Sequence, residues 1–450
     1  MNPSALILAT ILAPVGASEP PEAVTEIPDW NHDVSSLVAA RCTGCHRPNG
    51  AGPFSLESPG DLAARASFVM ELVESGRMPP SLVEGEGWRH DRRLSPAEVS
   101  LLRRWFAAGA PVDREDPDAS PVAAGRGVVE APSADWVTRR VAGTFAIPAE
   151  SDPAWHAGEI DQRGNAIPLD NDESWRVREI RIETGAPQAM RVASMVFDPT
   201  GAGRYLDDRD PRVGFLMAGD AGLVPSGAHG VILGGQDRLR WPDGFHQPVP
   251  PGSDLVVEWH YRPTGIEETM RPSVRLHLLD DAEAAVSRPL RWLPIGVGRV
   301  QVPAESVATV ESAVVTLDDP VDLVGVTPRA LEIATDVELL AWDPGQDPGS
   351  PGRSIIAFRD WDHHQRETVI SETPRRLAAG TRLRARFRLD NRSTNPSNPD
   401  SPAVDIRRGR RTGILAVFLH VAAIDPESDE RLAEAGTALI RDLRGRGGER

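Results

Sequence analysis

The hydrophobic pattern of the chain changes near residue 140, and the change divides it into two kinds of predicted structure. Before that point, apolar residues recur at helical spacing within 31–46, 58–76 and 95–113, which is typical of amphipathic helices. After it, short segments alternate apolar and polar residues between Gly, Pro and Asp turns. Period-two alternation at this spacing predicts antiparallel β-sandwiches.

The third helical segment carries the strongest boundary signals. Ser95 and Glu98 make an S-x-x-E capping box, Pro96 stands at the first helical position, and Gly109 follows the last apolar residue. Each of these residue types favours the helix end at which it stands. We therefore expect a small helical unit over residues 29–113.

The rest of the chain divides into segments that differ in composition and hydrophobic periodicity. Residues 114–139 are rich in Pro, Ala, Gly and acid without periodicity, so we interpret them as a linker. The alternating segments form two groups, 140–290 and 291–425, and each is long enough for one sandwich. Residues 426–450 return to helical spacing and predict a short terminal helix and tail. The predicted fold is a small all-α domain followed by two all-β antiparallel sandwiches.

Composition narrows the choice of partners. The 450 residues are 40% hydrophobic and carry a formal net charge of −17. This composition is ordinary for a globular protein, and the negative charge argues against a nucleic-acid partner, because phosphate backbones attract basic surfaces.

The N-terminus resembles an export signal. Its apolar core, Ala5 to Ala13, is far shorter than the roughly 20 residues needed to span a bilayer. Small residues near Ala17 and Ser18 suit a signal peptidase, although no Arg or Lys precedes the core. We expect 1–18 to be a signal peptide and the protein to be soluble in the periplasm or otherwise exported; the alternative is a buried apolar strand. No later segment predicts a transmembrane helix.

The two cysteines of the chain lie in one C-x-x-C-H motif, formed by Cys42, Cys45 and His46. Two thiols on one helical turn can form thioethers to the vinyl groups of haem, and the adjacent imidazole then ligates the iron. The alternatives are a redox thiol pair, half a zinc site or a disulfide. Nearby residues do not supply the remaining ligands of a zinc site. We expect one covalent haem c with His46 as the proximal ligand.

Met78 is the predicted distal ligand. It precedes Pro79, so it should lie in an extended loop that can present its thioether to the haem. The rival, Met70, lies mid-helix and suits a core. His/Met ligation fills both axial positions, so such a haem would pass single electrons rather than bind O₂.

Residues 29–113, with these motifs, resemble a small class I c-type cytochrome. The resemblance implies an all-α cytochrome c domain in which Cys42 and Cys45 attach haem and His46 and Met78 ligate iron. It covers about a fifth of the chain, as its bounds show.

A second resemblance covers roughly residues 140–425. The segments 250–265, PPGSDLVVEWHYRPTG, and 389–400, LDNRSTNPSNPD, are similar to the copper type II, ascorbate-dependent monooxygenases, which are relatives of the peptidylglycine hydroxylating enzymes. That family has two tandem jelly-roll domains, so the resemblance implies jelly-roll-like sandwiches at 140–290 and 291–425.

Only one of the six copper-ligand positions implied by this second resemblance keeps a ligand, His260. The other positions hold Ala193 and Ser194, then residues among Arg329, Ala330 and Leu331, then Ile414 or Leu415. Tight copper sites need about three nitrogen or sulfur donors, so we expect a degenerate copper site and no bound copper.

Five other histidines are candidate metal ligands. On a strand, His363 and His364 would point to opposite faces, so both could reach one metal only from a loop. The same half of the chain as His260 also contains His229, His246 and His277, but their separations in sequence do not indicate a shared metal site. We interpret His260 and the 363–364 pair as packed, hydrogen-bonded histidines, and a non-family metal site stays open.

The sequence therefore predicts an exported electron carrier that exchanges single electrons with a redox partner protein or small molecule. Its sandwiches would serve as a docking or ligand-binding scaffold, and no catalytic residue is assigned. The alternatives are an active copper-dependent monooxygenase fed by its own haem, and an envelope-interaction protein whose haem senses redox state.

Overall fold

The structure is a computed structural model that describes residues 27–48, 50–80, 83–89, 92–112, 135–150, 162–216, 227–408 and 415–445. The predicted signal peptide 1–18 lies outside these residues, as does most of the predicted linker 114–139. Within the described part, no helix is long and apolar enough to cross a membrane.

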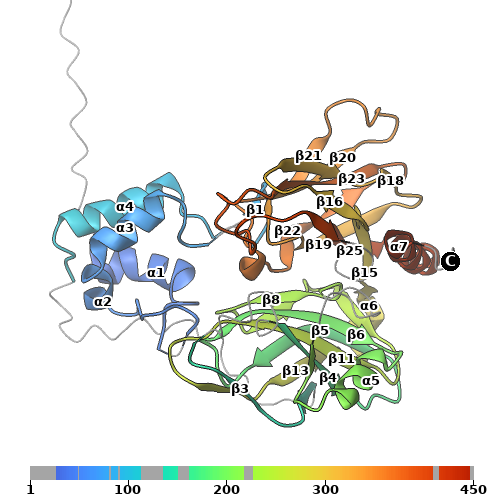
Figure 1. Cartoon of the computed structure of the whole chain (residues 1–450), viewed down its shortest axis with the longest axis horizontal. Coiled ribbons are helices and arrows are strands. Elements are labelled where there is room, and N and C mark those ends of the chain that lie inside the picture. Colours follow the sequence, from blue (N-terminus) through green and yellow to red (C-terminus); the bar gives the residue numbers. More distant parts are fainter. Residues whose placement is uncertain are drawn as a thin grey trace, which may run out of the picture.

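The N-terminal part is a group of short helices, drawn in blue in Figure 1. They are the π-helical turn η1 (Trp30–Val34), α1 (Ser35–Arg41), α2 (Pro59–Ala63), α3 (Ala66–Glu74) and α4 (Pro96–Ala107). The capping box is present, with Ser95 Oγ accepting from the Glu98 N–H and the Glu98 carboxylate accepting from the Ser95 N–H. The helices enclose a small apolar core made of Trp30, Val34, Leu37, Val38, Leu56, Leu62, Leu102 and Trp105.

The first sandwich has two facing sheets, green and yellow in Figure 1. One sheet runs β14-β10-β5-β13-β2 with β9 beside β5, and the other runs β7-β4-β11-β6-β8. Its strands and helices are β2 (Trp136–Arg140), β3 (Phe145–Ile147), β4 (Gln162–Pro168), β5 (Trp175–Glu183), β6 (Met190–Asp198), α5 (Ala202–Arg209), β7 (Phe215–Leu216), β8 (Val231–Leu233), β9 (Arg238–Arg240), β10 (Phe245–Val249), β11 (Asp254–Tyr261), β12 (Glu268–Met270), β13 (Ser273–Leu278), α6 (Asp281–Val286) and β14 (Arg288–Pro289).

The second sandwich, orange and red in Figure 1, pairs a sheet ordered β1-β21-β20-β23-β17, with β18 beside β23, with a sheet ordered β15-β25-β19-β22. Its elements are β1 (Val83–Glu84), β15 (Arg291–Val297), β16 (Val300–Val302), β17 (Val307–Glu311), β18 (Val315–Thr316), β19 (Val321–Arg329), β20 (Ala334–Trp342), β21 (Arg353–Arg359), η3 (His363–Gln365), β22 (Val369–Leu377), β23 (Arg382–Asp390), β24 (Ile406–Arg408), β25 (Leu415–Ala423), η4 (Pro426–Ser428) and α7 (Asp429–Arg444).

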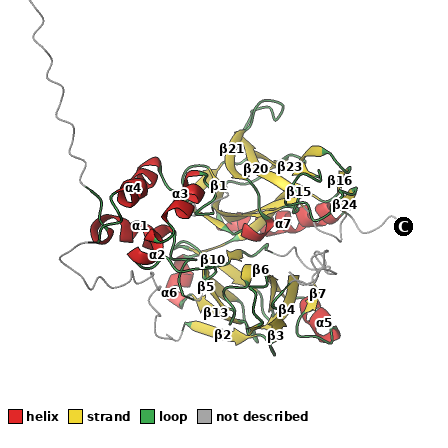
Figure 2. Cartoon of the chain, turned by 60° about the vertical axis from the view of Figure 1, so that its left-hand side comes forward, coloured by secondary structure: helices red, strands yellow, loops and turns green. Residues whose placement is uncertain are grey.

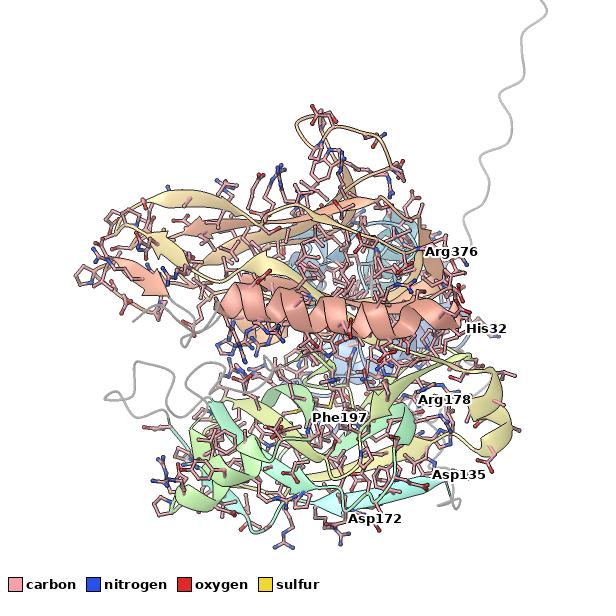
Figure 3. All side chains as sticks on the ribbon, turned by 90° about the vertical axis from the view of Figure 1, so that its right-hand side faces the viewer. His32, Asp135, Asp172, Arg178, Phe197 and Arg376 are labelled. Atoms are coloured by element: carbon pink, nitrogen blue, oxygen red, sulfur yellow. The ribbon has the colours of Figure 1, made fainter. Side chains whose placement is uncertain are left out.

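The predicted terminal helix is α7, which buries Leu432 and Ile440. Figure 3 shows this helix running across the seam between the two sandwiches. Gly436 permits the close packing, because a Cβ there would lie 2.3 Å from the Trp292 carbonyl oxygen.

The apolar cores of the two sandwiches are distinct, but three residues of the second sandwich reach the core of the first. Val324, Ile370 and Ala422 belong to the second sandwich by sequence, yet they pack into the core of the first. Strand β11 shows the consequence, since every one of its residues is buried. One face of β11 fills the first sandwich. On the other face, Val256 is covered by α5, and His260 is covered by the second sandwich.

The predicted fold class, a small all-α cytochrome c domain followed by two all-β antiparallel sandwiches, is wrong, because the structure has no N-terminal all-α cytochrome domain among its described residues. The described part of the chain is mainly β, with 38% strand and 20% helix, and its N-terminal part is not purely helical. Strand β1 pairs antiparallel with β21, and Figure 2 shows it beside the second sandwich. Val83 and Trp88 are buried in the core of that sandwich. Both side chains find more apolar surface there than the small helical core offers.

Trp88 should therefore stabilise the second sandwich although it lies in the N-terminal part. It is 3% exposed, and its indole N–H donates to the Ile355 carbonyl at 3.3 Å. We expect Trp88→Ala to lower the free energy of unfolding by about 3–5 kcal/mol, the usual cost of truncating a buried aromatic residue. Urea unfolding measures this change. Phe68→Ala, at a half-exposed helical position, is the control and should cost far less; equal losses would contradict the packing described.

Candidate functional site: a thiol–imidazole segment and a buried histidine cluster

The C-x-x-C-H segment continues helix α1 by one turn. The Cys42 N–H donates to the Val38 carbonyl at 2.8 Å, and the His46 N–H donates to the Cys42 carbonyl at 2.9 Å. This bonding brings Cys42 and His46 onto one helical turn.

His46 is held in a defined tautomer. Its Nδ1 lies 3.0 Å from the Phe54 carbonyl oxygen, and a carbonyl can only accept, so Nδ1 carries the proton. Burial lowers the pKa of His46, with the charge of Arg65 acting in the same direction. The neutral ring therefore keeps its lone pair on Nε2. Gly52 allows this placement, since a Cβ there would lie 2.6 Å from Nδ1.

Both thiols are free and half-buried. Burial raises the pKa of Cys42 to about 12, and the neighbouring Cys45 adds to the effect. Burial also raises the pKa of Cys45, against the opposing charges of Arg92 and Arg47. The thiols are thus protonated at neutral pH. The structure does not contain the disulfide that the sequence left open as an alternative, because both cysteines are free.

Cys45 points at the first sandwich. Its Sγ lies 3.7 Å from the Gly234 carbonyl oxygen, and a Cβ on Gly235 would approach that sulfur within 2.3 Å. The thiol segment therefore lies at the seam between the helices and the β-sheets.

At this seam, the Glu367 carboxylate contacts polar side chains from two other segments. The Arg92 Nη2 lies 2.6 and 2.5 Å from the two Glu367 carboxylate oxygens, and the Gln236 amide donates to Oε2 at 2.8 Å. One carboxylate thus joins the N-terminal part, the β8–β9 loop and the second sandwich.

The two candidate methionines lie apart from each other. Met70 packs half-buried against the small helical core, as expected for a core residue. Met78 follows α3 and is 36% exposed, outside the apolar cluster. The structure brings together Cys42, Cys45 and His46 through local chain bonding, and it leaves Met78 on a separate segment.

A second cluster lies where the polar face of β11 meets the second sandwich. Glu258 and His260 are two residues apart, so they share that face. Ser194 of β6 lies opposite Glu258 across the ladder. The turn η3 brings His363 and His364 against His260, with ring centroids 5.2 and 6.0 Å away.

Arg366 occupies the middle of this cluster and is buried. Its Nη2 donates to His260 Nε2 at 2.8 Å and to Ser194 Oγ at 3.2 Å. Its Nη1 lies 3.3 Å from His363 Nε2, and Nη2 lies 3.7 Å from the Glu258 carboxylate. Because Nη1 also lies 3.4 Å from His363 Nδ1, the guanidinium faces the His260 lone pair, the ring of His363 and one carboxylate.

The charges of this cluster are set by burial and by the ion pair. Burial lowers the pKa of His260 to about 4, helped by the charge of Arg366. Burial also lowers the pKa of Arg366, to about 10, against the opposing charge of Glu258. Burial opposes ionisation of Glu258, but hydrogen bonding with His260 and the charges of His260, Arg366 and Arg329 lower its pKa overall. At neutral pH the cluster holds a charged Arg366–Glu258 pair and a neutral His260.

Three of the remaining copper-ligand positions of the sequence analysis lie at this cluster. Ser194 Oγ accepts from Arg366, the Ala330 carbonyl oxygen lies 3.1 Å from His363 Nδ1, and the charge of Arg329 acts on Glu258. Ala193 and Leu415 are core residues of different sandwiches, and Ile414 lies outside the described residues. Over the described part of the chain, no group of three or more His, Cys, Asp or Glu side chains is arranged to hold a metal ion.

The other histidines have packing partners. His229 Nδ1 accepts from the Phe197 N–H, His246 Nδ1 bonds Ser287 Oγ, and His277 stacks on Trp136. Sequence reasoning overlooked Arg366 and His420. The only available signal was that Arg366 follows the His363–His364 pair by two residues.

Comparisons with known proteins do not assign the chain to a family. No family model matches it, and no curated protein does. Solved structures match at low similarity. PNGF-II, in its C2 crystal form, has 10% identity over 65% of this chain and 66% of its own, with a TM-score of 0.26. This chain thus spans just under two thirds of PNGF-II.

Two capsid proteins give similar values. STIV MCP has 11% identity over 66% of this chain and 98% of its own, with a TM-score of 0.25. The major capsid protein P2 from bacteriophage PM2 has 8% identity over 65% of this chain and 98% of its own, with a TM-score of 0.22. These values carry no argument about function.

Both family resemblances drawn from the sequence are corrected by these findings. A class I cytochrome c fused to a copper type II monooxygenase-like region would be expected to match a family model, and none matches. The mainly β chain, with its N-terminal part joined to a β-sheet, also departs from an independent helical cytochrome domain. Both family resemblances rest on short motifs, and short motifs alone do not establish a family.

Buried neutral histidines should make stability depend on pH. Burial lowers the pKa of His420 to about 3, whereas an unfolded histidine titrates near 6.5. Between these values the unfolded state binds more protons, so the free energy of unfolding should fall as pH drops from about 6.5 toward 3. Urea unfolding across this range measures the slope.

His420→Gln should make that slope shallower, by up to about 1.4 kcal/mol per pH unit, because one linked proton is removed. His420 Nε2 lies 2.7 Å from Thr327 Oγ1, so Thr327→Ala is the matched control. It removes the hydrogen bond and leaves the titrating group, so it should lower stability without changing the slope. An unchanged slope in His420→Gln would contradict the neutral buried state.

Proposed function

We propose that this protein is an exported single-electron carrier that holds one covalent haem c through Cys42, Cys45 and His46. The proposal rests on these residues and not on a family. The observation that carries it is the bonding of His46, because its Nδ1 donates to the Phe54 carbonyl and its Nε2 lone pair is left for a metal. Histidine ligands of metals commonly donate their other ring N–H to a carbonyl in this way.

The surroundings of the thiols suit a large apolar cofactor. Helix α3 carries Phe68, Val69, Met70, Leu72 and Val73, yet none of its residues is fully buried. Its apolar side chains are only partly covered, with Val69 and Met70 against the small core and Phe68 half-exposed, and incompletely covered apolar surface of this kind is typical of a binding site. A porphyrin attached to the adjacent thiols would cover such a surface. Both thiols are free, and thioether formation with haem requires cysteines that are not joined in a disulfide.

A bound haem supplies reversible one-electron chemistry at iron. The chain's own residues set where and how it is held. Cys42 and Cys45 fix its position on the helical turn, His46 fixes the proximal side, and Met78 is proposed to supply the distal thioether. The β-sandwiches would act as a docking or ligand-binding scaffold for a redox partner protein or small molecule. Export through the segment 1–18 is part of the proposal, and copper has no role in it.

The haem assignment is tested by absorption spectroscopy of protein exported from a host that attaches haem to C-x-x-C-H motifs. We expect about one haem per chain and a sharp low-spin α-band on reduction. His46→Ala should abolish that band or the attachment, whereas His32→Ala, at an exposed histidine outside the motif, should leave both unchanged. Full-length folded protein without haem would contradict the proposal. Tightly held copper with O₂-dependent hydroxylation would instead support the monooxygenase alternative.

The distal ligand is tested by carbon monoxide. Met78→Ala should open a coordination position, so the reduced protein should bind carbon monoxide at least about tenfold more tightly, because the gas no longer displaces a thioether. Met70→Ala is the matched control, and the wild-type affinity should persist in it. Equal affinities in wild type and Met78→Ala would show that Met78 is not a ligand. Flash photolysis and equilibrium titration report the affinity directly.

A further inference from the structure

Arg191 lies at a β-bulge in β6. In the ladder with β11, the register shifts after His260, which pairs with Val192, and Arg191 is left without a residue opposite it. Met190 and Ala193 both lie in the core of the first sandwich, although strict alternation along a strand would put them on opposite faces. The bulge absorbs this difference and re-aims the Arg191 side chain, which is half-buried.

The turn at residues 234–235 brings Arg191 close to the Cys45 thiol. The Gly234 N–H donates to the Arg191 carbonyl at 2.6 Å, and the Gly234 carbonyl oxygen lies 3.7 Å from Cys45 Sγ. Neither glycine leaves room for a side chain. A Cβ on Gly234 would lie 2.3 Å from the Met190 carbonyl oxygen, and a Cβ on Gly235 would lie 2.3 Å from Cys45 Sγ. The bulge and the thiol segment therefore share one tight turn.

The Cys45 thiol has three arginines around it, and two of them already have partners. Burial raises the pKa of Cys45, and the charges of the three arginines oppose this effect: Arg92, Arg47 and Arg191. Arg92 binds the Glu367 carboxylate, and Arg47 Nη1 donates to a backbone carbonyl at 2.8 Å. Within the part of the chain that the structure describes, the Arg191 guanidinium has no hydrogen bond or ion pair.

A second cation adds to the uncompensated charge of Arg191. The Arg262 N–H donates to the Ala189 carbonyl at 2.9 Å, which keeps Arg262 beside the bulge. Burial lowers the pKa of Arg191, and the charge of Arg262 acts in the same direction. Asp362 opposes this effect without forming an ion pair among the described contacts, and its Oδ1 accepts from the His364 N–H at 2.8 Å. An anion that accepts from the planar guanidinium would stabilise this arrangement.

We propose that Arg191 and Arg262 form a carboxylate-binding site at the seam beside Cys45. The fork of N–H groups on a guanidinium matches a carboxylate through two parallel hydrogen bonds. The favoured source of the carboxylate is a propionate of the haem, and this assignment rests on the function proposed above. Haem carries its propionates on the same macrocycle as its vinyl groups, so attachment at Cys45 would keep a carboxylate tethered in the neighbourhood of Arg191. The first sandwich would then contribute directly to the haem site.

Binding of the propionate anion to the full-length chain without haem tests the site itself. Wild type should bind propionate but not propionamide, its neutral amide, because the site recognises a negative charge. Arg191→Gln should weaken propionate binding at least about tenfold, the loss expected for one charge-assisted interaction. Arg47→Gln is the matched control and should bind like wild type, because Arg47 already has a partner. Isothermal titration calorimetry measures the affinities, and circular dichroism verifies the fold.

The haem-loaded chain distinguishes a haem propionate from a free organic carboxylate. If a haem propionate occupies the site, added propionate should bind at least about tenfold more weakly to the loaded chain than to the haem-free chain, because the tethered carboxylate competes with it. Arg191→Gln should also lower the reduction potential of the haem, because loss of a nearby positive charge favours ferric iron. Arg191→Lys keeps the charge and should restore most of that potential.

The proposed site would be overturned if haem-free wild type and Arg191→Gln bound propionate equally, or if neither bound it. A loaded chain that binds propionate as tightly as the haem-free chain would overturn the assignment to haem and assign the site to a free organic carboxylate. Failure of the chain to acquire haem would contradict the proposed function alone, because the titration of the haem-free chain still tests the site.

Discussion

The buried ion pair of Arg366 and Glu258 is the constraint on which the assembly of the two sandwiches depends. Opposite charges compensate each other at this depth, and removing either partner would leave the other buried with one opposing charge fewer, which is destabilising. Arg366 belongs to the second sandwich, and Glu258 belongs to the first. The sandwiches must therefore stay docked for both charges to be satisfied. The apolar contacts of Val324, Ile370 and Ala422 in the first core add to the same interface.

Glu367, which follows Arg366 in the chain, extends this constraint to the N-terminal part. Glu367 holds Arg92, and strand β1 and Trp88 lie in the sheet and core of the second sandwich. The thiol segment is consequently held at a seam, with Cys45 against the β8–β9 loop. A redox group at Cys42 and Cys45 would lie close to the β-sheets rather than on a free domain. Under the proposed function, that placement would connect the large β body physically to the electron carrier.

Local signals in the sequence predicted local structure well. The capping box of Ser95 and Glu98, the core position of Met70 and the terminal helix α7 all follow from side-chain spacing and short-range hydrogen bonding. The period-two segments correctly indicated a strand-rich remainder. The spacing of the C-x-x-C-H residues also anticipated their shared helical turn.

These local signals did not predict the long-range packing. Strand β1 spans only Val83–Glu84, too short for a period to appear, so its insertion into a sheet could not be foreseen. Alternation along β11 marks Glu258 and His260 as a polar face, and such a face usually meets solvent. Here the second sandwich covers it. His363 and His364 can both approach His260 because they lie on the turn η3. The sequence shows that such a turn would be needed, but it does not show that the turn forms.

Intact mass spectrometry under denaturing conditions is the most direct test of the central claim, that Cys42 and Cys45 hold a haem covalently. The measurement uses full-length protein exported from a host that attaches haem. The account predicts a chain heavier by one haem, with the added mass confined to the peptide that contains residues 42–46. A folded chain that carries no added mass, with both thiols free or joined to each other, would contradict it.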